Sequence, residues 1–415
     1  MRPSRRSAVP PFAVMTVLQR VAELRASGRE VISLCAGEPS QGAPSDVRRR
    51  LGELMLDRTP LGYSETFGLR PLRQAIAGHY QRWYGLDVPV EQIAVTTGSS
   101  GAFLISFLAA FDSGDRVVLA RPGYPAYRNI LSSLGCEVVE LACGPAERFQ
   151  PTRQLLDTAL ADGPVAGLVL ASPANPTGTM VDHDQLVDLS DWCAEHGVRL
   201  ISDEIYHGIV DASLARRVGP GCSAWQHDRS AVVISSFSKY WGMTGWRLGW
   251  ALIPDDLLTG VDALAGNYAL CAPVPAQHAA ITAFTESSYA EAEAAVREFA
   301  AARSLVLDAV DELGWTKVAP ADGAFYVWAD IAEQLGPHPD SGAWCAALLD
   351  AEGVAVTPGS DFDSLDGQTA IRLSLAAGPE AVGAALLRIH RFQLELGRSD
   401  ATRSRSPAAV RSARP

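Results

Sequence analysis

The chain has 415 residues, of which 47% are hydrophobic and 20% charged, and its formal net charge is −12 at pH 7. This length predicts two or three domains, and no apolar run approaches the roughly 18 residues of a membrane span. The negative charge argues against a nucleic-acid partner. The seven cysteines form no C-x-x-C pair, which fits free thiols in a reducing compartment rather than a metal or disulfide framework. Since the first residues lack an apolar stretch of signal-peptide length, we expect a cytoplasmic protein.

Strand-like and helical stretches alternate from Glu91 onward, a pattern that predicts a largely parallel sheet covered by helices. The apolar strand candidates lie within IAVTTG, DRVVLARPGY, VAGLVLASPANPTG, VRLISDEIY, AVVISSFSK and LGWALIP. An Ala/Glu-rich stretch over 276–313 has apolar residues at helical spacing and predicts a long helix that leaves the sheet. The later strand candidates WTKVAP, GAFYVWADI, GVAVTPG and TAIRLSLA predict a smaller α+β domain.

These patterns predict an α/β protein with four parts along the chain. Residues 1–40 form an amino-terminal segment that joins the small domain, and residues 41–280 form the large domain. Residues 281–396 form the small carboxy-terminal domain. The segment 397–415 is polar and low in complexity, so we expect it to be disordered.

Lysine is rare in this chain, because the 35 basic residues include only Lys239 and Lys317 beside the arginines. Unlike arginine, lysine can lose its proton and attack a carbonyl carbon, so Lys239 is a candidate nucleophile. Its loop follows the strand candidate AVVISS and contains serines, glycines and Arg247, which together can cradle a phosphate. The residues alone also permit a surface lysine in a glycine-rich turn. Lys317 has no comparable surroundings.

Four further positions place polar groups at the ends of, or within, apolar strands. Asp203 ends a strand, where a carboxylate needs a cation unless it serves as a helix N-cap. Asn175 follows another strand in an Asn-Pro turn, which by itself is ordinary turn chemistry. Residues 98–100 join a strand to a helix, so their amides can point at an anion. Arg372 lies in an apolar strand, where it can bind a carboxylate in a forked geometry or pair with a neighbouring acid.

The stretch SFSKYWGMTGWRLGW, with these motifs in the same order from Gly37 to Leu375, resembles the fold-type-I enzymes of pyridoxal phosphate (PLP), specifically the class I/II aminotransferases. The resemblance implies an α/β fold with a mostly parallel seven-stranded sheet in the large domain. It implies that Lys239 joins PLP as a Schiff base and later moves a proton, for which its pKa must fall from about 10.4. Asp203 would keep the ring nitrogen protonated, and Tyr206 would bond the phenolic oxygen.

The resemblance also assigns the residues that hold the cofactor. It implies binding roles for Gly98, Ser99, Ser100, Tyr124, Asn175, Asp203, Tyr206, Ser236, Ser238, Lys239 and Arg247. Among these, Tyr124 would stack on the PLP ring, and Ser236, Ser238 and Arg247 would hold its phosphate. Tyr63 matches a tyrosine that reaches the phosphate of the neighbouring subunit, which implies a homodimer.

For the substrate, the resemblance implies contacts with Gly37, Asn175 and Arg372, the last of which would take the α-carboxylate. A second basic residue for an acidic side chain is not found at the expected places. Ser100 stands where some relatives have lysine, and the stretch 264–277 has neither a basic residue nor the usual Ser/Thr-Asn-Pro pattern. A neutral aliphatic or aromatic amino acid is therefore favoured.

The hypothesis is an aminotransferase that moves the α-amino group of an L-amino acid to a 2-oxo acid such as 2-oxoglutarate or pyruvate. A PLP-dependent β/γ-lyase or cyclase begins with the same carbanion and is one alternative. A non-catalytic amino-acid sensor on this fold is a second, but the roughly 40 residues before the first pocket motif leave no room for a DNA-binding domain. We expect small-molecule substrates, and no metal, membrane or nucleic acid.

Overall fold

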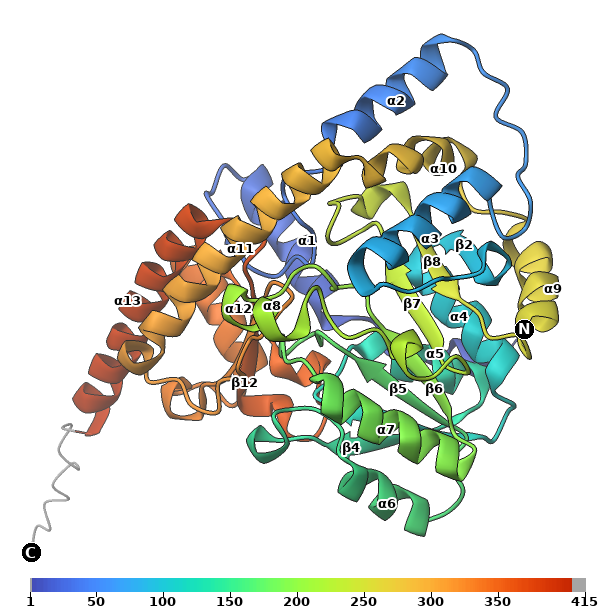
Figure 1. Cartoon of the computed structure of the whole chain (residues 1–415). Helices are drawn as coiled ribbons and strands as arrows, with labels where there is room; N and C mark the ends of the chain where they lie inside the picture. The colour runs from blue at the N-terminus through green and yellow to red at the C-terminus, as the bar shows by residue number, and fades with distance from the viewer. Residues whose placement is uncertain (1, 405–415) are drawn as a thin grey trace, which may run out of the picture.

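The computed structural model describes residues 2–404 and is built around a seven-stranded sheet in the order β2-β8-β7-β6-β5-β3-β4 (Figure 1). Its strands are β2 (Ile93–Thr97), β3 (Arg116–Arg121), β4 (Glu137–Ala142), β5 (Gly167–Ala171), β6 (Arg199–Asp203), β7 (Val232–Ser236) and β8 (Leu248–Leu252). β8 runs antiparallel to both of its neighbours, and all other pairs in this sheet are parallel. The predicted mostly parallel seven-stranded sheet is thus confirmed.

Within the described residues, eight helices belong to the same part of the chain, and several of them pack on this sheet. They are α3 (Arg70–Tyr84), α4 (Gly98–Ala110), α5 (Pro125–Leu134), α6 (Arg153–Ala161), α7 (His183–His196), α8 (Ala212–Val218), α9 (Leu258–Ala269) and α10 (Val274–Ala280). α4 packs on β7 and β8, α7 on β6, and α3 on β2. Because every residue of β7 and β8 is buried, both faces of the sheet are covered there, as continuous apolar strands require.

A second, antiparallel sheet in the order β11-β12-β9 lies in the carboxy-terminal part. Its strands are β9 (Tyr326–Asp330), β11 (Thr357–Pro358) and β12 (Ala370–Ser374), with α12 (Ser341–Glu352) against β11. The strand expected within WTKVAP is reduced to one bridge between Thr316 and Asp330. The amino-terminal part joins this region, because β1 (Ile32–Ser33) pairs in parallel with β10 (Val354–Ala355) and α1 (Ala13–Ala26) contacts β11.

Two long helices, α11 (Glu286–Leu313) and α13 (Pro379–Ser404), lie side by side at the edge of the molecule, and α2 (Ser45–Leu56) projects from it (Figure 1). The single helix expected over 276–313 is divided, because α11 starts anew behind Thr285, whose hydroxyl accepts from the Ser288 amide at 3.2 Å. α13 continues into the segment 397–415, for which the sequence predicts disorder, as far as Ser404. Residues 405–415 lie outside the described residues, and the domain boundaries stay a prediction.

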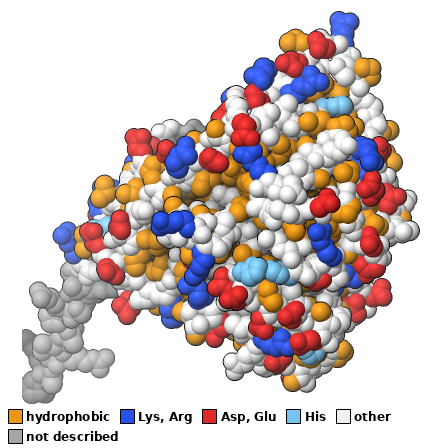
Figure 2. All heavy atoms as spheres, in the orientation of Figure 1, with side chains coloured by type: hydrophobic (Ala, Val, Ile, Leu, Met, Phe, Trp, Pro, Cys, Tyr) orange, Lys and Arg blue, Asp and Glu red, His pale blue; other side chains and the backbone are white. Residues whose placement is uncertain are grey.

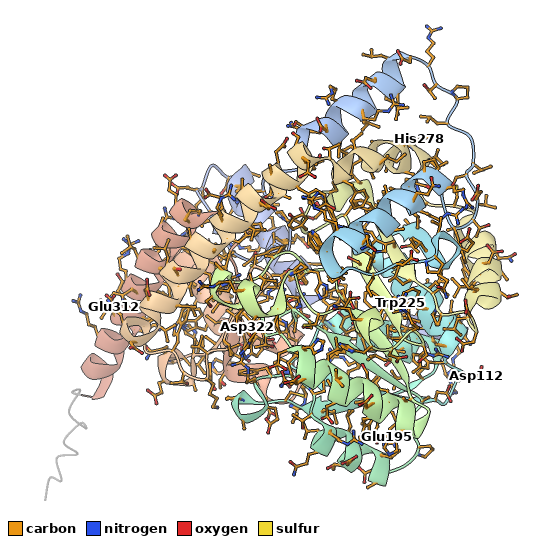
Figure 3. The ribbon with its side chains drawn as sticks, viewed as in Figure 1. Asp112, Glu195, Trp225, His278, Glu312 and Asp322 are labelled. Carbon is orange, nitrogen blue, oxygen red and sulfur yellow. The ribbon has the colours of Figure 1, made fainter. Side chains whose placement is uncertain are left out.

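The interior contains large aromatic side chains, with Trp192, Trp225, Trp250 and Trp344 all fully buried. Figure 3 labels Trp225 within the body of the molecule. On the face in Figure 2, acidic and basic side chains are interspersed. Across residues 2–404, no helix combines the length and apolar character that crossing a membrane requires.

Candidate active site

Lys239 lies in the turn after β7, with its amine directed at the backbone of a segment 202 residues earlier in the chain. The Nζ atom donates to the carbonyl oxygen of Gly37 at 2.8 Å. Burial lowers the pKa of Lys239 to about 8, and the nearby Glu38 carboxylate opposes this fall only in part. A substantial fraction of the amine is therefore neutral near physiological pH, which a nucleophile requires.

An anion cradle lies beside this amine, at the amino-terminal end of α4. Gly98 has φ +68°, and a Cβ at this position would collide with the guanidinium of Arg247, so only glycine allows the arginine to approach the helix end. On the other side of the cradle, the Ser236 hydroxyl donates to the Ser238 hydroxyl at 2.9 Å, and both serines are buried. The expected phosphate residues are thus brought together, with a hydroxyl pair, an arginine and a helix N-terminus.

Ser99 and Ser100 behave differently from each other. The amide of Ser99 lies so close to β8 that a Cβ on Gly249 would stand 2.8 Å from it. Ser100 is exposed on the first turn of α4. Of the two predicted serines, Ser99 is therefore the less exposed, and its amide lies against β8.

Asp203 ends β6 and is buried, with both carboxylate oxygens occupied. One accepts from the Ile205 amide at 3.0 Å and the other from the hydroxyl of Tyr127. Burial raises the pKa of Asp203 to about 6, against the opposing effects of these hydrogen bonds and of Lys239. A carboxylate in this position gains most from a cationic partner.

Two aromatic rings that the sequence interpretation missed surround the predicted ring-stacking residue. Tyr124 lies edge-on to Tyr127 with ring centroids 5.4 Å apart, and Tyr127 carries the hydroxyl that bonds Asp203. Phe12, just before α1, stacks on Tyr124 at 6.2 Å and 11°. The sequence could have indicated Tyr127 only through its spacing: it lies three residues after Tyr124, and residues three apart share a helix face. Nothing in the local sequence indicated Phe12.

Arg372, on β12, is the centre of a third group. Its guanidinium donates to the Asn175 side-chain oxygen at 2.9 Å, to the Cys35 carbonyl at 2.7 Å and to the Thr357 hydroxyl at 3.3 Å. All three acceptors are uncharged, and the buried Nε atom has no partner. An arginine held by these neutral groups leaves its positive charge available for an anionic ligand.

Tyr206 connects the amine to this arginine group. Its hydroxyl lies 2.9 Å from the hydroxyl of Tyr326, and the Lys239 Nζ atom lies 5.7 Å from the centre of its ring. The Tyr326 ring in turn lies 4.5 Å from the Arg372 guanidinium carbon. Tyr326 was also missed by the sequence interpretation, because its neighbours come from distant segments.

The buried carboxylate of Asp322 connects the loop that carries Asn175, after β5, to the segment before β9. The Asp322 side chain accepts from Arg148 at 2.8 Å and from the Met180 amide at 3.1 Å, and its carbonyl accepts from the Asp211 amide at 2.7 Å. Figure 3 labels Asp322 beside α8. These bonds fix the loop that carries Asn175 relative to β9 and β12.

Tyr63 is the one predicted site residue that the structure leaves apart from the others. It lies in the connection between α2 and α3, and 83% of it is exposed. Further large hydrophobic side chains exposed on this part of the chain and on the α9 region are Met55, Leu56, Tyr268 and Leu270.

Comparison with known proteins gives the class first. Solved structures that share this fold include an aminotransferase from Mycobacterium tuberculosis, with a TM-score of 0.90 and 48% identity over 95% of this chain and 100% of that one. Another is aspartate aminotransferase from Thermus thermophilus with maleate, with a TM-score of 0.86 and 31% identity over 94% of this chain and 100% of that one. The fold is that of the fold-type-I aminotransferases.

Residues 29–388 match the family described as aminotransferase class I and II, and the chain belongs to this family. A relative from Mycobacterium tuberculosis named valine–pyruvate aminotransferase is 49% identical over 92% of this chain and 96% of its own length. The family consists of PLP-dependent transferases, so the chain is an aminotransferase and the resemblance seen in the sequence is confirmed.

Proposed function

We propose that this aminotransferase binds PLP through Lys239 and moves the α-amino group of a neutral L-amino acid to a 2-oxo acid. The residues fit this cofactor, because a readily deprotonated amine, a buried carboxylate and an anion cradle share one site. One observation carries the proposal: a single short segment receives both key cations. The Lys239 amine donates to the carbonyl of Gly37, and the Arg372 guanidinium donates to the carbonyl of Cys35, two residues earlier.

The chain's own residues divide the work. Bound PLP supplies a ring that takes up the electron pair left when the Cα–H bond breaks. Asp203 holds the proton on the ring nitrogen, and Tyr127 holds Asp203 in place. With PLP bound, Lys239 would be the group that moves a proton from Cα to the cofactor's carbon, a role that its lowered pKa supports. Arg372 and Asn175 orient the substrate carboxylate so that the Cα–H bond faces the amine.

The surroundings of Arg372 support a neutral, apolar donor. The rings of Tyr326 and Phe362 flank its guanidinium at 4.5 and 4.6 Å, and Phe12 and Tyr124 form a further aromatic pair nearby. Such walls favour a hydrocarbon side chain over a charged one. With the name of the 49% identical relative, this points to valine or a similar aliphatic amino acid as donor and pyruvate as acceptor.

A screen of the twenty amino acids against pyruvate and 2-oxoglutarate tests this proposal. We expect the highest kcat/KM for aliphatic donors with pyruvate, and far lower values for aspartate. Each amino acid is also incubated without an oxo acid. A transaminase then stops after one half-turnover, whereas continued release of ammonia or thiol would identify a lyase and refute the proposal.

We also propose a homodimer in which Tyr63 serves the site of its partner. The exposed hydrophobic residues around Tyr63 and on the α9 region supply an apolar surface for such an interface. Inactive Lys239→Ala and impaired Tyr63→Ala variants are mixed, denatured and refolded together. A shared interface predicts recovery of activity, because one site of each hybrid dimer then has both an intact Lys239 and an intact Tyr63 from the other subunit. Activity no higher than that of the separate variants would contradict it.

The free cysteines support a cytoplasmic location. In the described part of the chain all seven are unpaired, and six of them are buried. Unpaired buried thiols are typical of a reducing compartment.

A further inference from the structure

Tyr326 shares a hydrogen bond with Tyr206 in the interior of the site. The two hydroxyl oxygens are 2.9 Å apart, and the residues are 120 positions apart in the chain. Burial raises the pKa of both phenols, so both keep their protons at neutral pH. Each hydroxyl has one proton and two acceptor lone pairs, so only one of the two can donate in this bond.

The ring of Tyr326, as distinct from its hydroxyl, contacts the guanidinium of Arg372. Tyr326 and Arg372 lie on adjacent antiparallel strands, where Arg372 is opposite Trp328 and Tyr326 is two residues before it. Diagonal neighbours of this kind lie on one face of a sheet. The guanidinium carbon is 4.5 Å from the ring centre, within the range of a cation–π contact.

The hydroxyl also lies against the segment that receives the Lys239 amine. A Cβ on Gly37 would stand 2.5 Å from the Tyr326 oxygen and 4.0 Å from the Lys239 Nζ atom. The absence of a side chain at Gly37 thus leaves space for the Tyr326 hydroxyl beside the reactive amine.

We propose that Tyr326 is a positioning residue whose hydroxyl donates to Tyr206 and thereby makes the Tyr206 hydroxyl a stronger donor to the phenolic oxygen of PLP, while the Tyr326 ring holds Arg372. The inference rests on the proposed function, because it needs Tyr206 to face the cofactor. The hydroxyl and the ring then have separable tasks: the hydroxyl acts on the cofactor, and the ring acts on the substrate carboxylate.

Tyr326→Phe tests the hydroxyl in the holoenzyme. A hydrogen bond to an anionic oxygen favours the deprotonated form, so its weakening raises the apparent pKa in a pH titration of the bound cofactor's absorbance. We expect a rise of about 0.3 pH units, because the Tyr206 hydrogen bond to the cofactor oxygen is weakened rather than lost, with KM for the amino acid within about twofold of wild type. Tyr326→Leu also removes the ring and should raise KM by about fivefold or more. An unchanged titration in Tyr326→Phe would overturn the proposal.

A double-mutant cycle shows whether Tyr326 acts through Tyr206. Tyr326→Phe should add no shift in a Tyr206→Phe background, whereas an additive shift would contradict the proposed path. Gly37→Ala is an independent perturbation, because it displaces the Tyr326 hydroxyl without removing it. Gly37→Ala should also raise the apparent pKa, and a titration like that of wild type would count against the proposal. This variant keeps the proposal testable if Tyr326→Phe does not fold.

Tyr289→Phe is the matched control. Tyr289 is also buried, and its hydroxyl lies 2.8 Å from the His79 Nδ1 atom, but it takes no part in the site. It should leave the titration unchanged. Wild-type protein that binds no PLP, or does not transaminate, would refute the proposed function. If the wild-type enzyme binds PLP and transaminates, but Tyr326→Phe leaves the apparent pKa of the cofactor unchanged, only the role of Tyr326 is refuted.

Discussion

Replacing Lys239 by methionine should stabilise the cofactor-free protein. The pKa of Lys239 falls from 10.5 to about 8 on folding, because burial disfavours the charged amine. The folded state therefore binds this proton less tightly than the unfolded state does. The shift of about 2.5 pH units corresponds to about 3 kcal/mol of destabilisation, which is complete below about pH 8 and disappears as the pH rises towards 10.5.

The assay is urea unfolding of both proteins, freed of cofactor and held at one concentration, at pH 7 and about pH 9.5. We expect the methionine variant to be more stable by about 3 kcal/mol at pH 7, and by only about 1.5 kcal/mol at the higher pH. Lys317→Met is the matched control, because that ammonium is exposed and pairs with Asp330, so no gain is expected. A variant no more stable than wild type, or a gain independent of pH, would refute the reasoning.

Three further changes test the site and the core beside it. Asp203→Asn should lower kcat at least about hundredfold while the fold is retained, because a neutral amide does not hold the proton of the ring nitrogen; near wild-type turnover would rule out this role. Arg372→Lys should raise KM for the donor by about tenfold or more with a smaller change in kcat, since the forked donor is lost; steady-state kinetics decide this. Burial raises the pKa of Glu204 to about 8, so the folded state holds a proton that the unfolded state releases, and stability falls as the pH rises from about 4.5 towards 8. Glu204→Gln should flatten that fall in urea midpoints measured across this range, and a slope like that of wild type would contradict it.

The sequence pointed to candidate site residues where these belong to continuous motifs. Lys239, Asp203 and Arg372 each lie just after, at the end of or within an apolar strand, where a charged group stands out. The parallel neighbours β6 and β7 bring Asp203 and Lys239 to one edge of the large sheet, whereas Arg372 lies on β12 of the second sheet. The long sheet was predictable for the same reason, because its strands are apolar on both faces.

What the sequence did not reveal depends on contacts between distant segments. Tyr326 looks like any aromatic residue of a buried strand, and only the folded chain places it beside Tyr206. Phe12 lies in a segment without a motif, yet it stacks on Tyr124. The break at Thr285 was missed because the Ala/Glu-rich pattern continues on both sides of a cap that depends on one hydroxyl.

The parallel pairing of β1 with β10 has a consequence for synthesis of the chain. Ile32 and Ser33 leave the ribosome long before Val354 and Ala355, so the first strand waits for its partner until most of the protein has been made. The backbone around Gly37, which receives the Lys239 amine, is anchored by that late pairing and by β12, because the Ser374 amide donates to the Leu34 carbonyl and Arg372 donates to the Cys35 carbonyl. The seven-stranded sheet is therefore fully synthesised by Leu252, before β10 and β12, which anchor this backbone, have been made.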